Sequence, residues 1–242
     1  MEQEQKRILE AVFGDSSDDE ENPKWELIKQ ITGLYLCTHF LSFDQQSSLI
    51  SAIKNEGWFT EESHNQAMRF GDLPAWAVEL SEAIRVAVSS RECMHEYNEW
   101  ETCDLDKEVC PLPSNLLWRE PLFDQLIVNT YQPGEGICAH VDLMRFEDGI
   151  AIVSLESTCV MQFTRGEREA DNYEKGESKE DHLITKIPIL LTPGSLIIMS
   201  GEARYLWKHE INRNAGFQVW KGTEISQKKR TSVTLRKLGY QN

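Results

Sequence analysis

Long hydrophobic segments are missing from this chain of 242 residues. A membrane-spanning helix needs about 18 or more consecutive apolar residues, and no stretch comes near that length. The first residues show neither the apolar centre of a signal peptide nor the arginine-rich, acid-poor composition of a transit peptide. We therefore expect a protein of the cytoplasm or the nucleus that has no membrane partner.

An excess of basic residues is also missing. The 25 Lys and Arg residues are outnumbered by 40 Asp and Glu residues, and the formal net charge is −15. A protein of this charge lacks the positive field that drives sequence-independent binding to the phosphates of long DNA. Tight, general binding to duplex DNA is therefore not expected.

Part of the acidity is concentrated at the N-terminus, where residues 1–22 hold eight acidic and two basic residues. This composition predicts an acidic, flexible segment over residues 1–23. Such a segment is suited to binding a basic protein partner, and Ser16 and Ser17 precede acidic residues as candidate phosphorylation sites. We expect the folded domain to cover residues 24–242.

Disulfide patterns are missing as well. The six cysteines include no CxxC pair, and a chain of this size does not need disulfides to hold its core together. We interpret the cysteines as reduced thiols of an intracellular protein.

Hydrophobic periodicity divides the expected domain into a helical part, residues 24–121, and a strand-rich part, residues 122–242. Ser42 is a candidate helix N-cap, and a second helix is expected after Pro74. Short apolar runs separated by Pro-Gly and Asp-Gly turns then predict strands at 126–128, 150–153, 159–163, 187–191, 196–199 and 231–235. The pattern predicts a mainly β (α+β) domain: a double-stranded β-helix, or cupin-like jelly roll, supported by N-terminal helices. We expect the charged residues 166–186 to form a long hairpin loop.

Three residues of the strand-rich part are candidate metal ligands. His140 and Asp142 lie two residues apart, so both side chains project to one side of an extended segment, and His209 follows another apolar run. Two histidines and one carboxylate are the facial triad of non-haem Fe(II) oxygenases. Each part also has a simpler interpretation, because a His-x-Asp pair is common by chance and a lone histidine can be hydrogen-bonded in a core.

Arg230 and Arg236 mark a candidate anion site. They share the parity of one alternating strand and so lie on the same face. Buried guanidinium groups need anionic partners, and a dicarboxylate offers a bidentate partner to each arginine. The alternative is a solvated basic edge formed by Lys228, Lys229 and Arg230.

The order of these motifs resembles the AlkB family of Fe(II)- and 2-oxoglutarate-dependent dioxygenases. Asn129-Thr130-Tyr131 corresponds to the family's N-x-Y, and it is followed by the His-x-Asp pair, a Gly-Glu-Ala-Arg segment that leads to His209, and an R-x-S-x-T-x-R strand. The similarity covers residues 124–238. It implies Fe(II) as cofactor and 2-oxoglutarate and O2 as cosubstrates, with succinate and carbon dioxide released as a substrate carbon is hydroxylated or a methyl group is removed.

The resemblance also implies a role for each motif residue. The iron ligands would be His140, Asp142 and His209. Tyr131, Arg230 and Ser232 would hold the distal carboxylate of 2-oxoglutarate, and Asn129 and Arg236 would attend the carboxylate next to the iron.

Within the family the chain is most similar to the branch of the tRNA wobble-uridine hydroxylase. Met144 occupies the position where bacterial members have an acidic residue that contacts the alkylated base, which disfavours cationic methylated DNA bases. Residues 55–75 correspond to the nucleotide lid, where Arg69 and Phe70 are candidates for phosphate contact and base stacking. The same residues can equally be a surface arginine and a core aromatic.

Three functions remain open at this stage. The favoured one is oxidation of a modified or alkylated nucleobase, in RNA or tRNA rather than duplex DNA. The second is hydroxylation of a protein or a small molecule, which the acidity and a similarity to the family's mitochondrial branch at Pro193-Gly194-Ser195-Leu196 suggest. The third is a non-catalytic interaction protein on the same scaffold.

Overall fold

The computed structural model describes residues 22–61, 64–94, 110–165, 186–214 and 218–239. Two predictions fall outside these ranges: the acidic segment up to residue 21, and the loop at 166–185. The boundary between segment and domain therefore stays a prediction. β7 ends at Arg165 and β8 begins at Lys186, and the two strands pair in antiparallel fashion.

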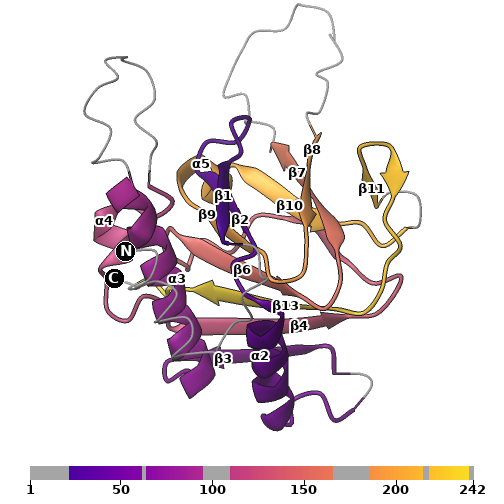
Figure 1. The fold of residues 1–242 in the computed structure, drawn as a ribbon, viewed down its shortest axis with the longest axis horizontal. Helices are drawn as coiled ribbons and strands as arrows, with labels where there is room; N and C mark the ends of the chain where they lie inside the picture. The colour runs from indigo at the N-terminus through magenta and orange to yellow at the C-terminus, as the bar shows by residue number, and fades with distance from the viewer. Residues whose placement is uncertain (1–21, 62–63, 95–109, 166–185, 215–217, 240–242) are drawn as a thin grey trace, which may run out of the picture.

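Two antiparallel sheets form the body of the protein (Figure 1). The larger has the strand order β1-β2-β9-β6-β13-β4-β3 and the smaller β5-β10-β7-β8. The larger sheet consists of β1 (Lys24–Leu27), β2 (Leu34–Thr38), β3 (Gln66–Phe70), β4 (Gln125–Tyr131), β6 (Ile150–Leu155), β9 (Leu196–Met199) and β13 (Arg230–Arg236). The smaller consists of β5 (Ile137–His140), β7 (Cys159–Arg165), β8 (Lys186–Leu191) and β10 (Trp207–Ile211), and β11 (Val219–Trp220) and β12 (Thr223–Glu224) form a separate ribbon. This architecture confirms the expected jelly roll.

The helices α2 (Phe43–Asn55) and α3 (Ala75–Met94) cover the side of the larger sheet that faces away from the smaller one (Figure 1). Ser42 caps α2 as expected, because its hydroxyl accepts from the backbone of Gln45 and the Gln45 side chain accepts in return from the backbone of Ser42. Two short helices, α4 (Ser114–Leu117) and α5 (Gly201–Tyr205), complete the described part. None of the described helices combines the length and the apolar character that crossing a membrane requires.

Strand alternation gives the larger sheet two different faces. On the helix side, Val128 and Val233 join Leu49 and Leu80 in one buried cluster. On the other side, Ile152 and Ile197 join residues of the smaller sheet in a second cluster. Thr234 pairs with Ile152 in the ladder between β13 and β6, and paired residues share a face. The even-numbered residues of β13 therefore face the space between the sheets, where the candidate site lies.

Candidate active site

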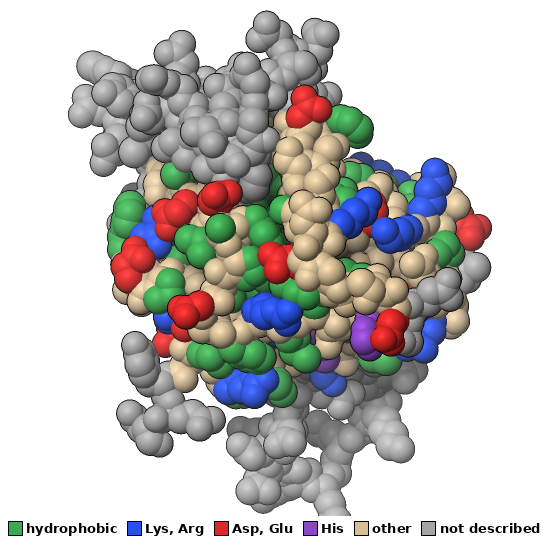
Figure 2. All heavy atoms as spheres, turned by 90° about the horizontal axis from the view of Figure 1, so that it is seen from below, with side chains coloured by type: hydrophobic (Ala, Val, Ile, Leu, Met, Phe, Trp, Pro, Cys, Tyr) green, Lys and Arg blue, Asp and Glu red, His purple; other side chains and the backbone are tan. Residues whose placement is uncertain are grey.

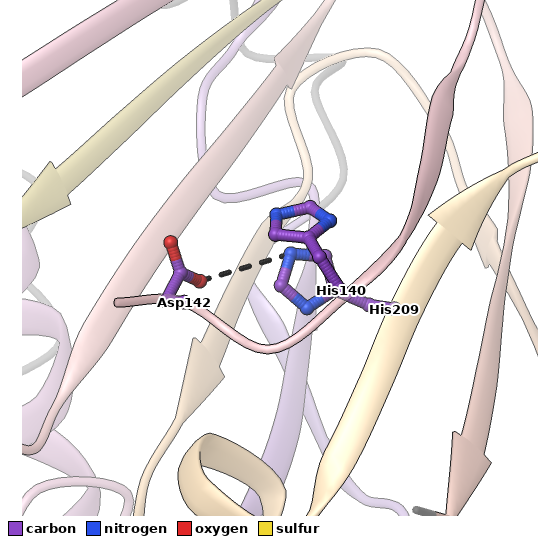
Figure 3. Close-up of side chains that lie close together, drawn as sticks. All are labelled: His140, Asp142 and His209. Carbon is purple, nitrogen blue, oxygen red and sulfur yellow. Dashed lines mark ion pairs between the residues drawn. The ribbon is translucent and has the colours of Figure 1, made fainter. Parts of the chain in front are cut away.

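Three side chains converge where β5, the loop after it and β10 meet (Figure 3). His140 ends β5 and His209 lies opposite it on β10, with their ring centroids 4.3 Å apart. Asp142 follows β5 by two residues. One ligand atom from each of the three lies within 4.8 Å of the others. The structure thus brings together the three residues that the sequence marks as iron ligands.

The ring of His140 is oriented by a backbone carbonyl. Its Nδ1 lies 2.8 Å from the carbonyl oxygen of Cys138. Because a carbonyl oxygen only accepts, Nδ1 is the donor of this hydrogen bond, and Nε2 is the ring nitrogen left to bind a metal. Metal-binding histidines use this arrangement to fix the tautomer and the ring direction.

Asp142 has one occupied and one free carboxylate oxygen. Its Oδ1 forms an ion pair with Nη2 of Arg236. Its Oδ2 lies 3.8 Å from Nε2 of His209 and, although buried, has no hydrogen-bond donor among the described residues. A buried carboxylate oxygen without a partner is costly, and a cation held between Asp142 and the two imidazoles would satisfy it. Two neutral nitrogens and one anionic oxygen are a donor set that fits Fe(II).

His209 is neutral around pH 7. Its pKa is lowered from 6.5 to about 4, chiefly by burial, and the charges of His140, Arg236 and Arg204 act in the same direction while Asp142 opposes them. The neutral imidazole is the form that binds metals, so protons do not compete for this ligand at physiological pH.

Arg204 belongs to the site, although the sequence motif assigned it no role. It lies on α5 and is 1% exposed. Its Nη1 donates to the carbonyl oxygen of Asp142 at 3.0 Å, and its Nη2 donates to those of Leu143 at 2.8 Å and Phe146 at 3.1 Å. These bonds fasten the loop that carries Asp142 to the segment that leads into β10 and His209. The sequence signal for Arg204 was a single arginine next to apolar residues. That signal does not reveal that its partners are backbone carbonyls some sixty residues away.

The polar face of β13 adjoins the metal ligands. It carries Ser232 and Thr234 between the two arginines, and all four are buried. Their partners on β4 share this face. The register pairs Arg230 with Tyr131, Ser232 with Asn129 and Arg236 with Gln125. The five residues predicted for 2-oxoglutarate therefore lie on one face, with small hydroxyl side chains between the arginines and Arg236 at the metal end.

Arg230 has an unpartnered guanidinium end. Its Nε donates to Ser154 Oγ at 3.0 Å, whereas Nη1 and Nη2 are buried and have no hydrogen-bond partner in the described part of the chain. The group lies over the ring of Tyr131, 5.5 Å from its centroid. Burial raises the pKa of Tyr131 although Arg230 acts against it, so the hydroxyl stays protonated and can donate. These N–H and O–H groups fit one carboxylate of a dicarboxylate ligand.

The residues predicted for the substrate pocket do not all lie together. Met144 is 73% and Phe70 47% exposed. Phe70 pairs with Gln125 and so shares the face of Arg236. Arg69 lies on the opposite face, where its guanidinium stacks 4.4 Å from the ring centroid of Trp58. The structure does not bring Arg69 to the site, because residues 66–70 form a strand, in which adjacent side chains point to opposite faces. This strand was not predicted from the sequence.

Comparison with known proteins agrees with this geometry. The profile of the 2OG-Fe(II) oxygenase superfamily matches residues 33–236. An "Alkylated DNA repair protein ALKBH8 homolog" from Arabidopsis thaliana is 27% identical over 231 residues, which are 86% of this chain and 59% of that protein. A "tRNA (carboxymethyluridine(34)-5-O)-methyltransferase alkbh8" from Xenopus tropicalis is 29% identical over 180 residues, which are 74% of this chain and 25% of that protein.

The chain thus spans 59% and 25% of the lengths of these two relatives. The solved structure of OsALKBH1 shares the fold, with a TM-score of 0.54 at 14% identity, and the match covers 88% of this chain and all of that one. The superfamily profile covers most of the chain, and the triad lies where such an enzyme needs it. The protein belongs to the 2OG-Fe(II) oxygenase superfamily as an AlkB-like dioxygenase that uses Fe(II), 2-oxoglutarate and O2.

Proposed function

We propose that this dioxygenase oxidises a modified or alkylated nucleobase in RNA, with His140, Asp142 and His209 holding the iron. The observation that carries the ligand assignment is the buried, donor-free Oδ2 of Asp142 beside Nε2 of His209. A structural role for the three residues would leave that oxygen without compensation.

Arg230 and Tyr131 are assigned to the distal carboxylate of 2-oxoglutarate, with Ser232 beside them. Support comes from the two free nitrogens of Arg230 and from the protonated hydroxyl of Tyr131. Asn129 and Arg236 are assigned to the carboxylate next to the iron, because they lie on the same face and Arg236 contacts Asp142.

When bound, iron and 2-oxoglutarate supply the oxidising chemistry, in which O2 converts the oxo-acid to succinate and carbon dioxide and hydroxylates a substrate carbon. The protein side chains prepare this chemistry. The neutral imidazole of His209 keeps its lone pair, Arg236 directs one oxygen of Asp142, and Arg204 fixes the loop that carries Asp142. The burial of His209 and Asp142, each 5% exposed, keeps bulk water from these ligands.

One observation supports a nucleobase as the substrate, and a second favours RNA over duplex DNA. The relatives' names refer to repair of alkylated DNA and to a modified uridine of tRNA. Figure 2 shows acidic, basic and hydrophobic side chains interspersed on one face of the protein, and the formal net charge of −15 does not favour binding to duplex DNA. An enzyme that acts on a base needs it unpaired, and single-stranded RNA loops present such bases without the energy of strand opening.

The dioxygenase assignment is tested by turnover without substrate. Purified protein with Fe(II), ascorbate and 2-oxoglutarate is expected to release succinate, and His140→Ala and Arg230→Ala are expected to lose most of it. Arg165→Gln is the matched control, because this arginine pairs with Glu202 and is assigned to no ligand. Equal succinate from all four proteins would contradict the assigned ligands.

The substrate is tested by mass spectrometry of nucleosides. Total tRNA, other RNA and single-stranded DNA are incubated with the active protein and digested. Gain of an oxygen atom or loss of a methyl group on one nucleoside, absent with His140→Ala, is the expected result. If no nucleic acid changes while succinate is still released, the nucleobase proposal is wrong and a protein or small-molecule substrate is favoured instead.

A further inference from the structure

We propose that Arg145 and Phe70 together form a recognition site for an anionic group on the substrate nucleotide, with Arg145 on the loop that carries Asp142. This inference rests on the proposed nucleic-acid substrate and adds to it the chemistry that is recognised. It concerns an arginine to which neither the sequence motifs nor the family resemblance gave a role.

The backbone of Arg145 is fixed close to the iron ligand Asp142. Its carbonyl oxygen accepts a hydrogen bond of 2.8 Å from the backbone of Gly239, and the backbone of Glu147 donates to the carbonyl of Lys237 at 2.8 Å. On the inner side, Arg204 holds the carbonyls on both sides of Arg145. The loop is therefore anchored on two sides, and it presents the Arg145 side chain from a defined position.

The side chain of Arg145 lies near two aromatic rings of different exposure. Its guanidinium carbon is 5.1 Å from the centroid of Phe146, which is 3% exposed, and 5.7 Å from that of Phe70, which is 47% exposed. Such contacts hold a guanidinium by its flat face and leave its N–H edge available. Arg145 forms no ion pair among the described residues. Its charge is therefore available for a ligand.

The surroundings of Arg145 are apolar and positive. Leu143 is 60% and Met144 73% exposed, and both directly precede Arg145 in the chain. Two more arginines lie close by: the guanidinium carbon of Arg236 is 4.9 Å from the centroid of the same Phe146 ring, and Arg204 donates to the carbonyl oxygen of Phe146. In a chain of net charge −15 this is a local positive field beside the reacting centre. A local field selects one anionic group without general attraction to nucleic acid.

An aromatic ring next to a free guanidinium matches the chemistry of a nucleotide. A base stacks on an exposed ring such as Phe70 whatever its sequence, and the guanidinium edge binds a carboxylate or a phosphate oxygen pair in bidentate fashion. Two groups on a nucleotide offer this chemistry: the backbone phosphate, and a carboxylate carried on the base itself.

Binding to a fluorescent single-stranded oligouridylate is the test, measured by anisotropy with Mn(II) and 2-oxoglutarate so that no turnover occurs. Arg145→Gln is expected to weaken binding by about tenfold, as for the loss of one charge-assisted contact. The slope of log K against log salt is expected to become shallower by about 0.7. Phe70→Ala is expected to weaken binding with the slope kept. Arg165→Gln is the matched control, because Arg165 also lies over an aromatic ring, Trp207, but is paired with Glu202.

Three oligonucleotides distinguish the source of the anion: one with uridine, one with a carboxymethyl group on the target base, and one with its methyl ester. An equal effect of Arg145→Gln on all three identifies the phosphate, and an effect confined to the carboxymethyl base identifies that carboxylate. Unchanged binding by Arg145→Gln and Arg145→Glu would overturn this inference and leave the proposed function standing. Failure of the unaltered protein to bind any of the three would overturn both.

Discussion

Arg236 pairs with Oδ1 of Asp142, and this contact leaves Oδ2 directed at the imidazole of His209. The arginine thus sets the direction of the carboxylate assigned to the iron, in addition to its own assigned contact with 2-oxoglutarate. Gln125, opposite Arg236 on β4, accepts from Nη1 at 3.5 Å and supports the guanidinium from the other side.

Replacing Arg236 should therefore weaken metal binding before any cosubstrate is added. We expect Arg236→Met to lower the affinity for Mn(II) or Fe(II) by about 10- to 100-fold, the usual effect of losing a group that orients a ligand. Isothermal titration of the metal-free protein measures this. Arg236→Lys should recover part of the affinity, since it keeps the charge but not the planar fork. Unaltered metal affinity in both variants would show that Asp142 needs no orientation.

Arg204 should matter for stability as well as for the metal. Arg204→Met leaves the carbonyls of Asp142, Leu143 and Phe146 without their donor. The expected loss in the free energy of unfolding is about 3 kcal/mol or more. Urea unfolding with and without Mn(II) is the measurement, and the stabilisation gained from the metal should also shrink. A variant that loses stability but gains as much from Mn(II) as the unaltered protein would limit Arg204 to a structural role.

The sequence was sufficient to predict the residues of the site wherever the pattern that marks them lies within a few consecutive residues. The alternation of β13 is visible in Arg230-Thr231-Ser232-Val233-Thr234-Leu235-Arg236, and the structure places its two kinds of residue on two faces. His140 and Asp142 could be paired because they lie two residues apart.

Other features depend on contacts that no local pattern contains. β3 is an edge strand with one buried residue, Ala67, so its sequence lacks the apolar alternation that would separate Arg69 from Phe70. The partners of Arg204 are backbone carbonyls, which every residue has, and one aromatic neighbour of Arg145, Phe70, comes from a remote strand. These arrangements arise from tertiary packing and could not be predicted from the chain.

Arg230 should affect cosubstrate binding and leave metal binding intact. Arg230→Ala removes the free nitrogens assigned to the distal carboxylate, and we expect the Kd for 2-oxoglutarate to rise by about tenfold or more. Tyr131→Phe should give a smaller rise, because it removes one hydroxyl donor. Titration of 2-oxoglutarate into the Mn(II) protein gives both values. The assignment fails if Arg230→Ala binds 2-oxoglutarate normally, or if it loses the metal as fully as His140→Ala does.

The acid sensitivity of the metal-free protein should come in part from His209. Its pKa is about 4 in the folded protein against 6.5 for an unperturbed histidine, so the unfolded chain binds the proton more readily. The contribution of His209 to the free energy of unfolding is therefore complete above pH 6.5. It is lost as the pH falls toward 4, at up to about 1.4 kcal/mol per pH unit. Urea unfolding of the metal-free protein between pH 7.5 and 4.5 measures the slope. His209→Asn removes the titrating group, so its slope should be shallower over this range. Parallel slopes for the two proteins would show that His209 takes up its proton as easily in the folded state as in the unfolded chain.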